Sequence, residues 1–213
     1  VRVQPNGLWA VAAHVTAFEA ERNPDGGPVD SNPYGVLAAP GRQYVTDAGG
    51  NSLLEVRGGG VSLVATFPAR PVPPGLPGIP PIPAYEAVPT GVAEGPDGAL
   101  YVSGLTGAPF LPGAAVIYRV TPGAAPTVYA GGFTAVTDFA FGPDGSLYVV
   151  QFASAPFLSG PGSVVRVAPT GARTTVAAGL IAPTGVAVGP DGAVYVVNKG
   201  PFVGGGEVLR IVP

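Results

Sequence analysis

The chain of 213 residues contains no cysteine and no methionine, and it has a single histidine. Without cysteine, the chain can hold neither a disulfide framework nor a thiolate site. The lone histidine, His14, is expected to be structural, and no Gly-x-Ser-x-Gly nucleophile motif is present. We therefore predict no catalytic residues, and a protein that is not an enzyme is favoured.

Charge and long apolar runs are also scarce. Charged residues make up 11% of the chain, the formal net charge is -3, and Lys199 is the one lysine. The absence of a basic patch argues against nucleic acid as a partner. No run of about 18 apolar residues is present, so no membrane span is expected. Few lysines in a chain rich in Gly, Pro, Ala and Val favour an exported protein, extracellular or periplasmic.

Glycine and proline are abundant instead, with 34 and 27 residues, beside a hydrophobic content of 46%. This mixture indicates many short strands joined by tight turns. The motif Gly-Pro-Asp-Gly occurs at 95–98, 142–145 and 189–192, a spacing of 47 residues, and a degenerate copy lies within 36–45. Apolar residues flank each copy, and Pro, Asp and Gly favour a turn, so each copy predicts a β-hairpin.

A period near 47 residues with about four short strands per unit is typical of a propeller blade. The predicted fold is therefore an all-β β-propeller of four-stranded antiparallel blades, with about four blade repeats in one domain, 1–213. The segments are strands c–d of a partial blade (1–12), a loop (13–33), a blade (34–67), a Pro-rich loop insertion (68–87), and blades at 88–133, 134–180 and 181–213.

The two ends of the chain allow two interpretations. Residues 1–12 match strands c and d of a blade, and 181–213 stops after strand c, so Leu8–Ala12 would complete the last blade as its strand d. Such a join removes exposed strand edges. Alternatively, the chain is the C-terminal part of a larger, six-bladed ring. The start at Val1 rather than at methionine favours this second interpretation.

Binding is expected on the face of the ring where the loops vary in length. Three loops between strands b and c share a Pro-Phe pair, which places Phe110, Phe157 and Phe202 at equivalent positions. These rings either form an apolar rim for a ligand or partner, or each packs on its own blade. The Pro-rich segment 68–83 is expected to be extended and polyproline-like, as a strap for a partner or against the ring itself.

Polar residues recur at matched strand ends. Strand b is followed by Asp47, Gly104, Gln151 and Asn198, whereas strand a begins at Tyr34, Thr90, Thr137 and Thr184. We expect Tyr34, Asp138 and Asn198 near the mouth of the central channel as ligand-binding candidates. Asp47, Asp138 and Asn198 could bind Ca²⁺ through oxygen atoms, assisted by Glu19, Glu21, Asp25 and Asp30. Alternatively, such residues satisfy backbone groups. No other cofactor is expected.

Several motifs resemble a known family. The segments AFEAERNPDGG (17–27) and DSNPYG (30–35), followed by DAGGN (47–51) and VPTG (88–91), resemble the ScyD/ScyE-like proteins, bacterial propellers with NHL-type blades named from the scytonemin pigment gene cluster. The resemblance covers nearly the whole chain. It implies an exported propeller, typically longer than this chain, and the family brings no established catalytic residues.

Two functional hypotheses follow. The first is an exported, non-enzymatic propeller that binds a protein partner or assembles with itself through the loop-rich face. The second is a metal-dependent propeller lyase or lactonase with its site at the channel mouth.

Overall fold

The three Gly-Pro-Asp-Gly segments form hairpin turns in the computed structural model, which describes residues 2–212. In each turn the second glycine has a positive φ, for example 75° at Gly98, a conformation that side chains disfavour. The aspartate caps the turn, since Asp144 Oδ1 accepts a hydrogen bond from the Ser146 N–H at 3.0 Å. The turn chemistry predicted from the sequence is thereby confirmed.

Strands joined by these turns form antiparallel sheets that correspond to the blades. The first contains β3 (Pro33–Ala39), β4 (Arg42–Asp47), β5 (Ser52–Arg57) and β6 (Gly60–Thr66). The second contains β9 (Pro89–Glu94), β10 (Leu100–Gly104), β11 (Ala115–Val120) and β12 (Thr127–Phe133). The third contains β13 (Val136–Phe141), β14 (Leu147–Gln151), β15 (Gly162–Val167) and β16 (Arg173–Leu180). The fourth contains β17 (Gly185–Val188), β18 (Val194–Asn198) and β19 (Glu207–Ile211).

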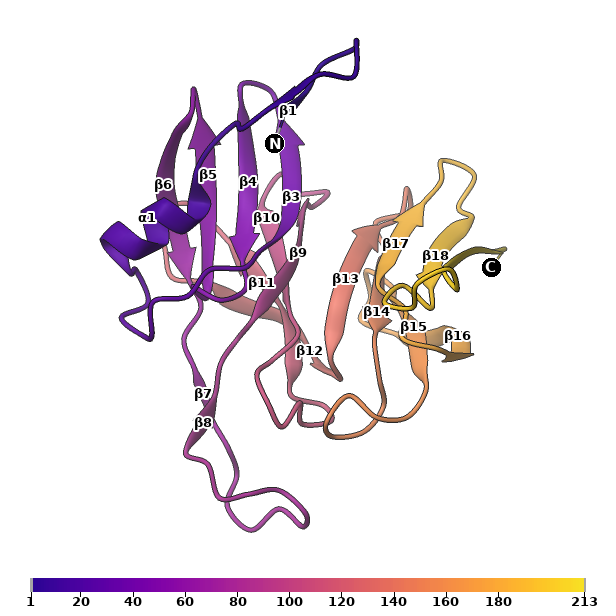
Figure 1. The fold of residues 1–213 in the computed structure, drawn as a ribbon. Helices are drawn as coiled ribbons and strands as arrows, with labels where there is room; N and C mark the ends of the chain where they lie inside the picture. The colour runs from indigo at the N-terminus through magenta and orange to yellow at the C-terminus, as the bar shows by residue number, and fades with distance from the viewer. Residues whose placement is uncertain (1, 213) are drawn as a thin grey trace.

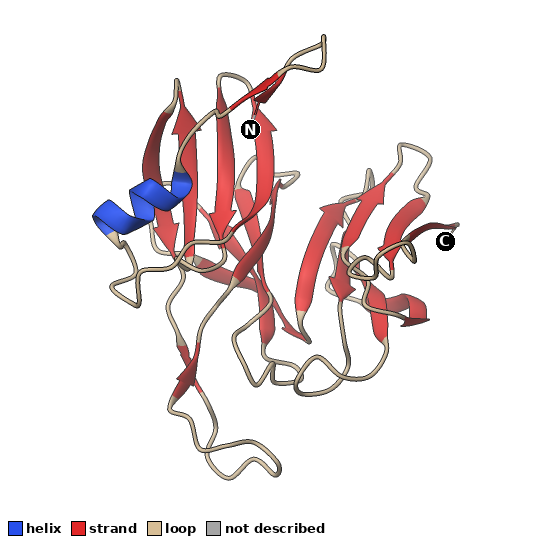
Figure 2. Cartoon of the chain, in the orientation of Figure 1, coloured by secondary structure: helices blue, strands red, loops and turns tan. Residues whose placement is uncertain are grey.

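The four blades are arranged as a β-propeller, as Figures 1 and 2 show. Contacts between the first strands of successive blades run β3 to β9, β9 to β13 and β13 to β17. Hydroxyl groups join these strands, since Thr90 Oγ1 donates to the Val136 carbonyl at 3.0 Å and Thr137 Oγ1 to the Pro183 carbonyl at 3.1 Å. The all-β propeller predicted from the sequence is confirmed.

A tyrosine on the second strand of each blade marks the contact between blades. Tyr44, Tyr101 and Tyr148 are 7%, 3% and 4% exposed because each lies in an apolar cluster with residues of the following blade. The equivalent residue of the fourth blade, Tyr195, is 36% exposed. The described residues therefore bury one face of the fourth sheet and leave its other face accessible.

The N-terminal segment departs from the prediction. β2 (Trp9–Ala10) pairs with β1 (Arg2–Val3) and not with β19, so the fourth sheet has three strands among residues 2–212. The reason is local: the Gln4 N–H bonds the Leu8 carbonyl at 2.7 Å and closes a short hairpin. Trp9 remains 68% exposed. The predicted completion of the last blade by Leu8–Ala12 is wrong for this structure, and Val1 and Pro213 lie outside the described residues.

Two further elements lie in segments that the sequence predicted as loops. Within 13–33, α1 (Val15–Arg22) forms because Ala, Glu and Arg favour a helix. It ends at Asn23, whose φ of 38° is left-handed. Within 68–87, β7 (Arg70–Pro71) pairs with β8 (Ala84–Tyr85) at the base of a projecting hairpin. None of the helices in residues 2–212 has the length and apolar character needed to cross a membrane.

Replacing Tyr148 with alanine should destabilise the protein far more than the same change at Tyr195. Removal of a large buried ring costs about 3–5 kcal/mol, whereas Tyr195 is already 36% exposed. Urea unfolding of both variants measures the difference, and the loss at Tyr195 is expected to be less than half of the loss at Tyr148. Equal losses would contradict the role of this face in packing between blades.

Candidate functional site

Polar side chains that end the second strand fasten the loop that enters the same blade. In three blades a side-chain oxygen accepts a hydrogen bond from a backbone N–H of that loop. The pairs are Asp47 with Asn32 (2.6 Å), Gln151 with Thr134 (2.7 Å) and Asn198 with Ile181 (2.8 Å). The repeated geometry supports the alternative in which these residues satisfy backbone groups.

The residues predicted to bind Ca²⁺ have separate sets of partners. Asp47 Oδ2 accepts a hydrogen bond from Ser31 Oγ at 2.6 Å, and Asn198 Nδ2 donates to Glu207 Oε1 at 2.7 Å. Asp138 shares none of these partners. Within residues 2–212, no three His, Cys, Asp or Glu side chains are already placed to hold an ion together. Calcium at the channel mouth stays a prediction.

Asp138 brings a carboxylate to the first strand of the third blade. The other three blades have a glycine there: Gly35, Gly91 and Gly185. Asp138 Oδ2 accepts a hydrogen bond from the Val186 N–H at 2.9 Å, which connects the third and fourth blades. A Cβ on Gly91 would lie 2.8 Å from Asp138 Oδ1. The small residue therefore makes room for the carboxylate.

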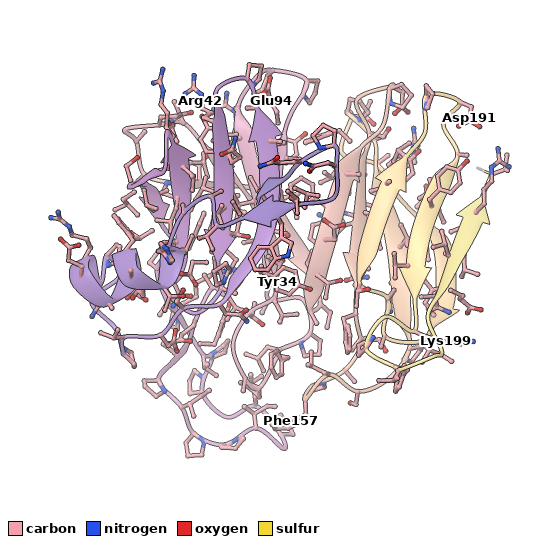
Figure 3. All side chains as sticks on the ribbon, turned by 45° about the horizontal axis from the view of Figure 1, so that its top comes forward. Tyr34, Arg42, Glu94, Phe157, Asp191 and Lys199 are labelled. Atoms are coloured by element: carbon pink, nitrogen blue, oxygen red, sulfur yellow. The ribbon has the colours of Figure 1, made fainter. Side chains whose placement is uncertain are left out.

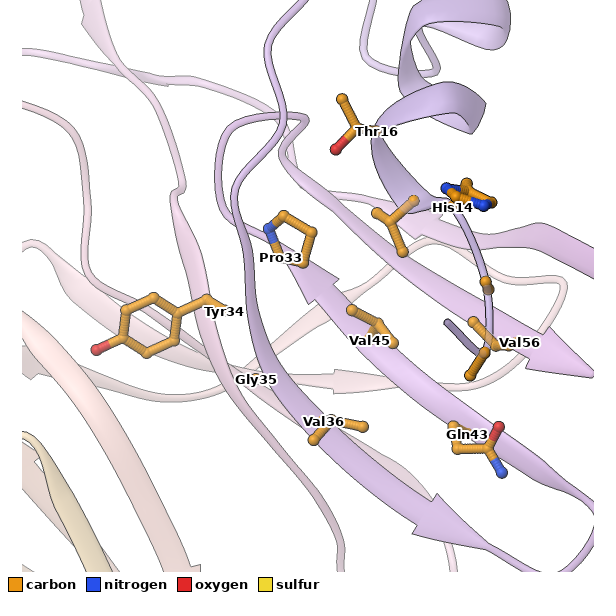
Figure 4. A pocket seen from close by; sticks show the side chains of 12 residues that line it. His14, Thr16, Pro33, Tyr34, Gly35, Val36, Gln43, Val45 and Val56 are labelled. Atoms are coloured by element: carbon orange, nitrogen blue, oxygen red, sulfur yellow. The ribbon is translucent and has the colours of Figure 1, made fainter. Parts of the chain in front are cut away.

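Burial raises the pKa of the Asp138 carboxyl, and hydrogen bonds from the Val186 and Phe139 N–H groups oppose this rise. Tyr34 is 47% exposed, and its ring points away from the pocket drawn in Figure 4. Burial raises the pKa of Tyr34, and the negative charge of Asp138 raises it further. The structure thus places two of the predicted site residues, Tyr34 and Asp138, within electrostatic range of each other.

Asp138→Asn should change how stability depends on pH. The pKa of Asp138 is higher in the folded state than in the unfolded state. The wild type therefore loses stability as the pH rises from the unfolded-state pKa of this carboxyl through its folded-state pKa. The asparagine variant lacks this loss and keeps an oxygen for the Val186 N–H. Urea unfolding from pH 3.5 to 7 should show a variant at least as stable as the wild type at pH 7.

Asp191→Asn is the matched control with the opposite sign. The Ala193 N–H, and after it the Arg210 guanidinium, lower the pKa of Asp191 in the folded state. The ionised Asp191 carboxylate therefore stabilises the wild type at pH values above its unfolded-state pKa. A larger loss of stability at pH 7 in Asp138→Asn than in Asp191→Asn would contradict the interpretation of Asp138.

The two ends of the blades differ in chemistry. Figure 3 shows Arg42, Glu94 and Asp191 at one end, with Phe157 and Lys199 at the other. The first end has ion pairs between the turn and the third strand. They are Arg119–Asp97 (2.8 Å), Arg166–Asp144 (2.7 Å), Arg210–Asp191 (3.0 Å) and, with the charges exchanged, Arg42–Glu55 (3.4 Å). In the first blade the arginine and the carboxylate have changed places relative to the other blades. This paired change of charge was the signal in the sequence for these ion pairs, and it was not recognised.

The three phenylalanines of the loop-rich face are not equivalent in exposure. Phe157 and Phe202 are 56% and 54% exposed, whereas Phe110 is half-buried. Phe110 and Phe157 share a positive φ, at 57° and 56°. The Phe157 N–H bonds the Pro109 carbonyl at 2.9 Å, which joins the loops of the second and third blades. The side chains of Phe157 and Phe202 are therefore accessible to a partner, whereas the side chain of Phe110 is accessible only in part.

A groove of about 470 Å³ lies between the Pro-rich hairpin and these loops. Arg70 fixes one wall, because its Nη1 donates to the Ala114 carbonyl at 2.8 Å and its guanidinium lies 5.9 Å from the Tyr85 ring centre. Apolar residues from both segments complete the lining: Pro71, Pro73, Leu76, Pro77, Ile79, Leu111, Pro112 and Pro156. Sequence reasoning predicted the strap but had no signal for this groove.

A second pocket, of about 410 Å³, lies where the N-terminal segment crosses the first blade (Figure 4). Val36, Gln43, Val45 and Val56 form its floor, and His14 lies at its edge. His14 precedes α1 and makes no side-chain hydrogen bond that caps the helix. Two strand residues with polar groups line the pocket, Gln43 and Tyr34, and the Tyr34 ring points away from the other lining side chains.

Comparison with known proteins supports the fold. No protein-family model matches the chain, and no curated protein matches it, so the ScyD/ScyE-like resemblance stays a prediction. Among solved structures, the chain is similar to a candidate gluconolactonase (TM-score 0.57, 18% identity, covering 89% of this chain and 65% of that one). It is also similar to a gluconolactonase from Xanthomonas campestris (TM-score 0.55, 18% identity, covering 83% of this chain and 60% of that one). A third similar structure is a streptogramin B lyase (TM-score 0.54, 14% identity, covering 86% of this chain and 56% of that one). The chain thus spans less than two thirds of the length of each.

Proposed function

We propose that the protein is an exported binding propeller that captures an extended apolar segment of a partner protein on its loop-rich face. The observation that carries this proposal is the groove between the Pro-rich hairpin and the loops of the second and third blades. Its lining of Pro, Leu and Ile suits apolar side chains, and Tyr85 adds an aromatic wall. The export part of the proposal rests on composition.

Two features support binding over a purely structural role for this face. Phe157 and Phe202 remain more than half exposed, although buried rings would contribute more to folding. Exposed apolar side chains on one face are typical of interaction sites. Neither ring lines the groove itself, but Phe157 directly follows Pro156, which does. Proline restricts the strap before binding, so less conformational entropy is lost when a partner is bound.

Replacing both Phe157 and Phe202 with serine should weaken binding without unfolding the protein. Each ring buried at an interface contributes about 1.5–3 kcal/mol, which is roughly 10- to 100-fold in affinity. The probe is a library of hydrophobic and proline-rich decapeptides displayed on phage and selected on the immobilised protein. Fluorescence anisotropy then measures the selected peptides.

Val128→Ser is the matched control, because Val128 is 56% exposed but lies on β12, on a blade strand outside the loops. The control should bind like the wild type. If no peptide is enriched, or if the double serine variant binds as tightly as the control, the loop-rich face is not the binding site.

A second candidate function is a lactonase or lyase with its site at the channel mouth. It is favoured by the single carboxylate of Asp138 among glycines of the equivalent strands, and by the similarity to propellers with those activities. Hydrolysis of a sugar lactone would be followed with and without Ca²⁺. If the candidate holds, Asp138→Asn should slow hydrolysis by about 100-fold or more, and a rate no higher than that of buffer would exclude it for that substrate.

A further inference from the structure

Four carboxylates gather where the segment from α1 to β3 meets the turn between β4 and β5. They belong to Glu19, Asp25, Asp30 and Asp47, and the three aspartates all act on Glu19 through their charges. Six ion pairs are formed in residues 2–212, and none includes any of these four side chains. The described part of the protein therefore holds this concentration of negative charge without a basic partner.

Glu19 gives an independent sign that something is bound here. Its side chain is 1% exposed, and its Oε1 atom is buried without a hydrogen-bond partner among the described residues. The Asn23 Oδ1 atom, one helical turn further on, is also buried without a partner. A buried acceptor left unpaired is strongly unfavourable. Glu19 Oε1, on which three aspartates act through their charges, therefore needs a hydrogen-bond donor or a cation, and Asn23 Oδ1 is a second unpaired oxygen in the same segment.

The local backbone is shaped around these oxygens. A Cβ on Gly50 would lie 2.6 Å from Glu19 Oε2, and a Cβ on Gly49 would collide with Asp30 Oδ1. Both glycines are therefore needed for the carboxylates to reach the turn. Asn51 fixes the far side of the cluster, because its Nδ2 donates to Asp25 Oδ2 at 3.0 Å.

No three carboxylates of residues 2–212 are placed to hold an ion together without rearrangement. We propose that this cluster closes around a divalent cation and binds Ca²⁺ through Glu19, Asn23 and Asp25, with Asp47 beside it. The site lies at the edge of the first blade and does not depend on the loop-rich face. It differs from the channel-mouth site predicted from the sequence, which joined Asp47 to Asp138 and Asn198 and gave Glu19 and Asp25 only an assisting role.

The donor set selects the metal. All the available side-chain donors are oxygen atoms, which suits a hard cation. Zn²⁺ prefers nitrogen and sulfur ligands, and the one histidine of the chain is not part of the cluster. Mg²⁺ demands a small octahedral shell, whereas Ca²⁺ accepts six to eight ligands in flexible geometry. Backbone carbonyls and water would complete the shell around two carboxylates and one amide.

Binding would order the entrance to the first blade. Asp47 already holds this entrance, since it accepts hydrogen bonds from Ser31 Oγ and from the Asn32 N–H. Neutralising the surrounding charge would stabilise α1 and the following loop against β4 and β5. The ion therefore has a structural role, and its loss should loosen the N-terminal segment while the other blades remain folded.

The test is a calcium titration of the full chain after treatment with EDTA. Isothermal titration calorimetry should show one Ca²⁺ per chain. Thermal unfolding should shift upward by about 5–10 °C at a free concentration near 100 times Kd, and Mg²⁺ at the same concentration should give less than half of that shift. Hydrogen exchange in residues 15–32 should slow when Ca²⁺ is added.

Glu19→Gln and Asp25→Asn are the test variants, and Glu21→Gln is the matched control. Glu21 lies on the same helix but is exposed and pairs with Arg22. Glu19→Gln removes repulsion, so without Ca²⁺ it should be at least as stable as the wild type, yet its response to Ca²⁺ should be lost. Asp25→Asn gives the second measurement and should weaken Ca²⁺ binding at least 10-fold. Glu21→Gln should respond like the wild type.

The proposal is overturned if the wild type shows no heat of binding and no thermal shift with Ca²⁺ up to about 10 mM. This limit lies well above the Kd of the weakest known calcium-binding modules, which is about 1 mM. It is also overturned if both Glu19→Gln and Asp25→Asn keep the full response, or if Glu21→Gln loses it equally. Peptide binding on the loop-rich face is measured separately, so failure of one proposal leaves the other testable.

Discussion

The propeller depends on packing each small sheet face to face against a neighbouring sheet, because a four-stranded sheet has no core of its own. Each of the first three blades packs a tyrosine and aliphatic side chains against Val, Leu or Phe side chains of the next blade. The first three blades bury this tyrosine almost completely. The turns can therefore be short and uniform, and the strand order follows from packing. Variation is confined to the loops, where the groove lies.

The same constraint explains the polar residues at strand ends. Loops that enter a blade carry backbone N–H groups into a partly buried region, and an unpaired N–H there is costly. Asp47, Gln151 and Asn198 each supply the missing acceptor. Their recurrence in the sequence has the same appearance as a ligand set, because both need oxygen atoms at fixed positions. Only the partners in three dimensions separate the two roles.

What repeats along the chain could be predicted from the sequence, and what occurs once could not. The 47-residue period and the turn chemistry indicated the hairpins, the blades and the face with variable loops. The pairing of β2 with β1 depends on a local turn that competes with a distant strand edge. The groove depends on how Arg70 bonds the Ala114 carbonyl, a contact across 44 residues. Neither leaves a periodic pattern, so sequence reasoning had no signal for them.

The four segments that resemble the ScyD/ScyE-like family are the segments that the structure joins at one place. Asn51, from DAGGN, donates to Asp25 and accepts a hydrogen bond from the Val88 N–H at 3.1 Å. Asp47, from the same segment, bonds Ser31 and Asn32 of DSNPYG. A motif that only closed a turn would not need partners in three other segments. These residues are better explained as one unit that fixes the first blade, and the buried, unpaired Glu19 within it explains why that unit would need a cation.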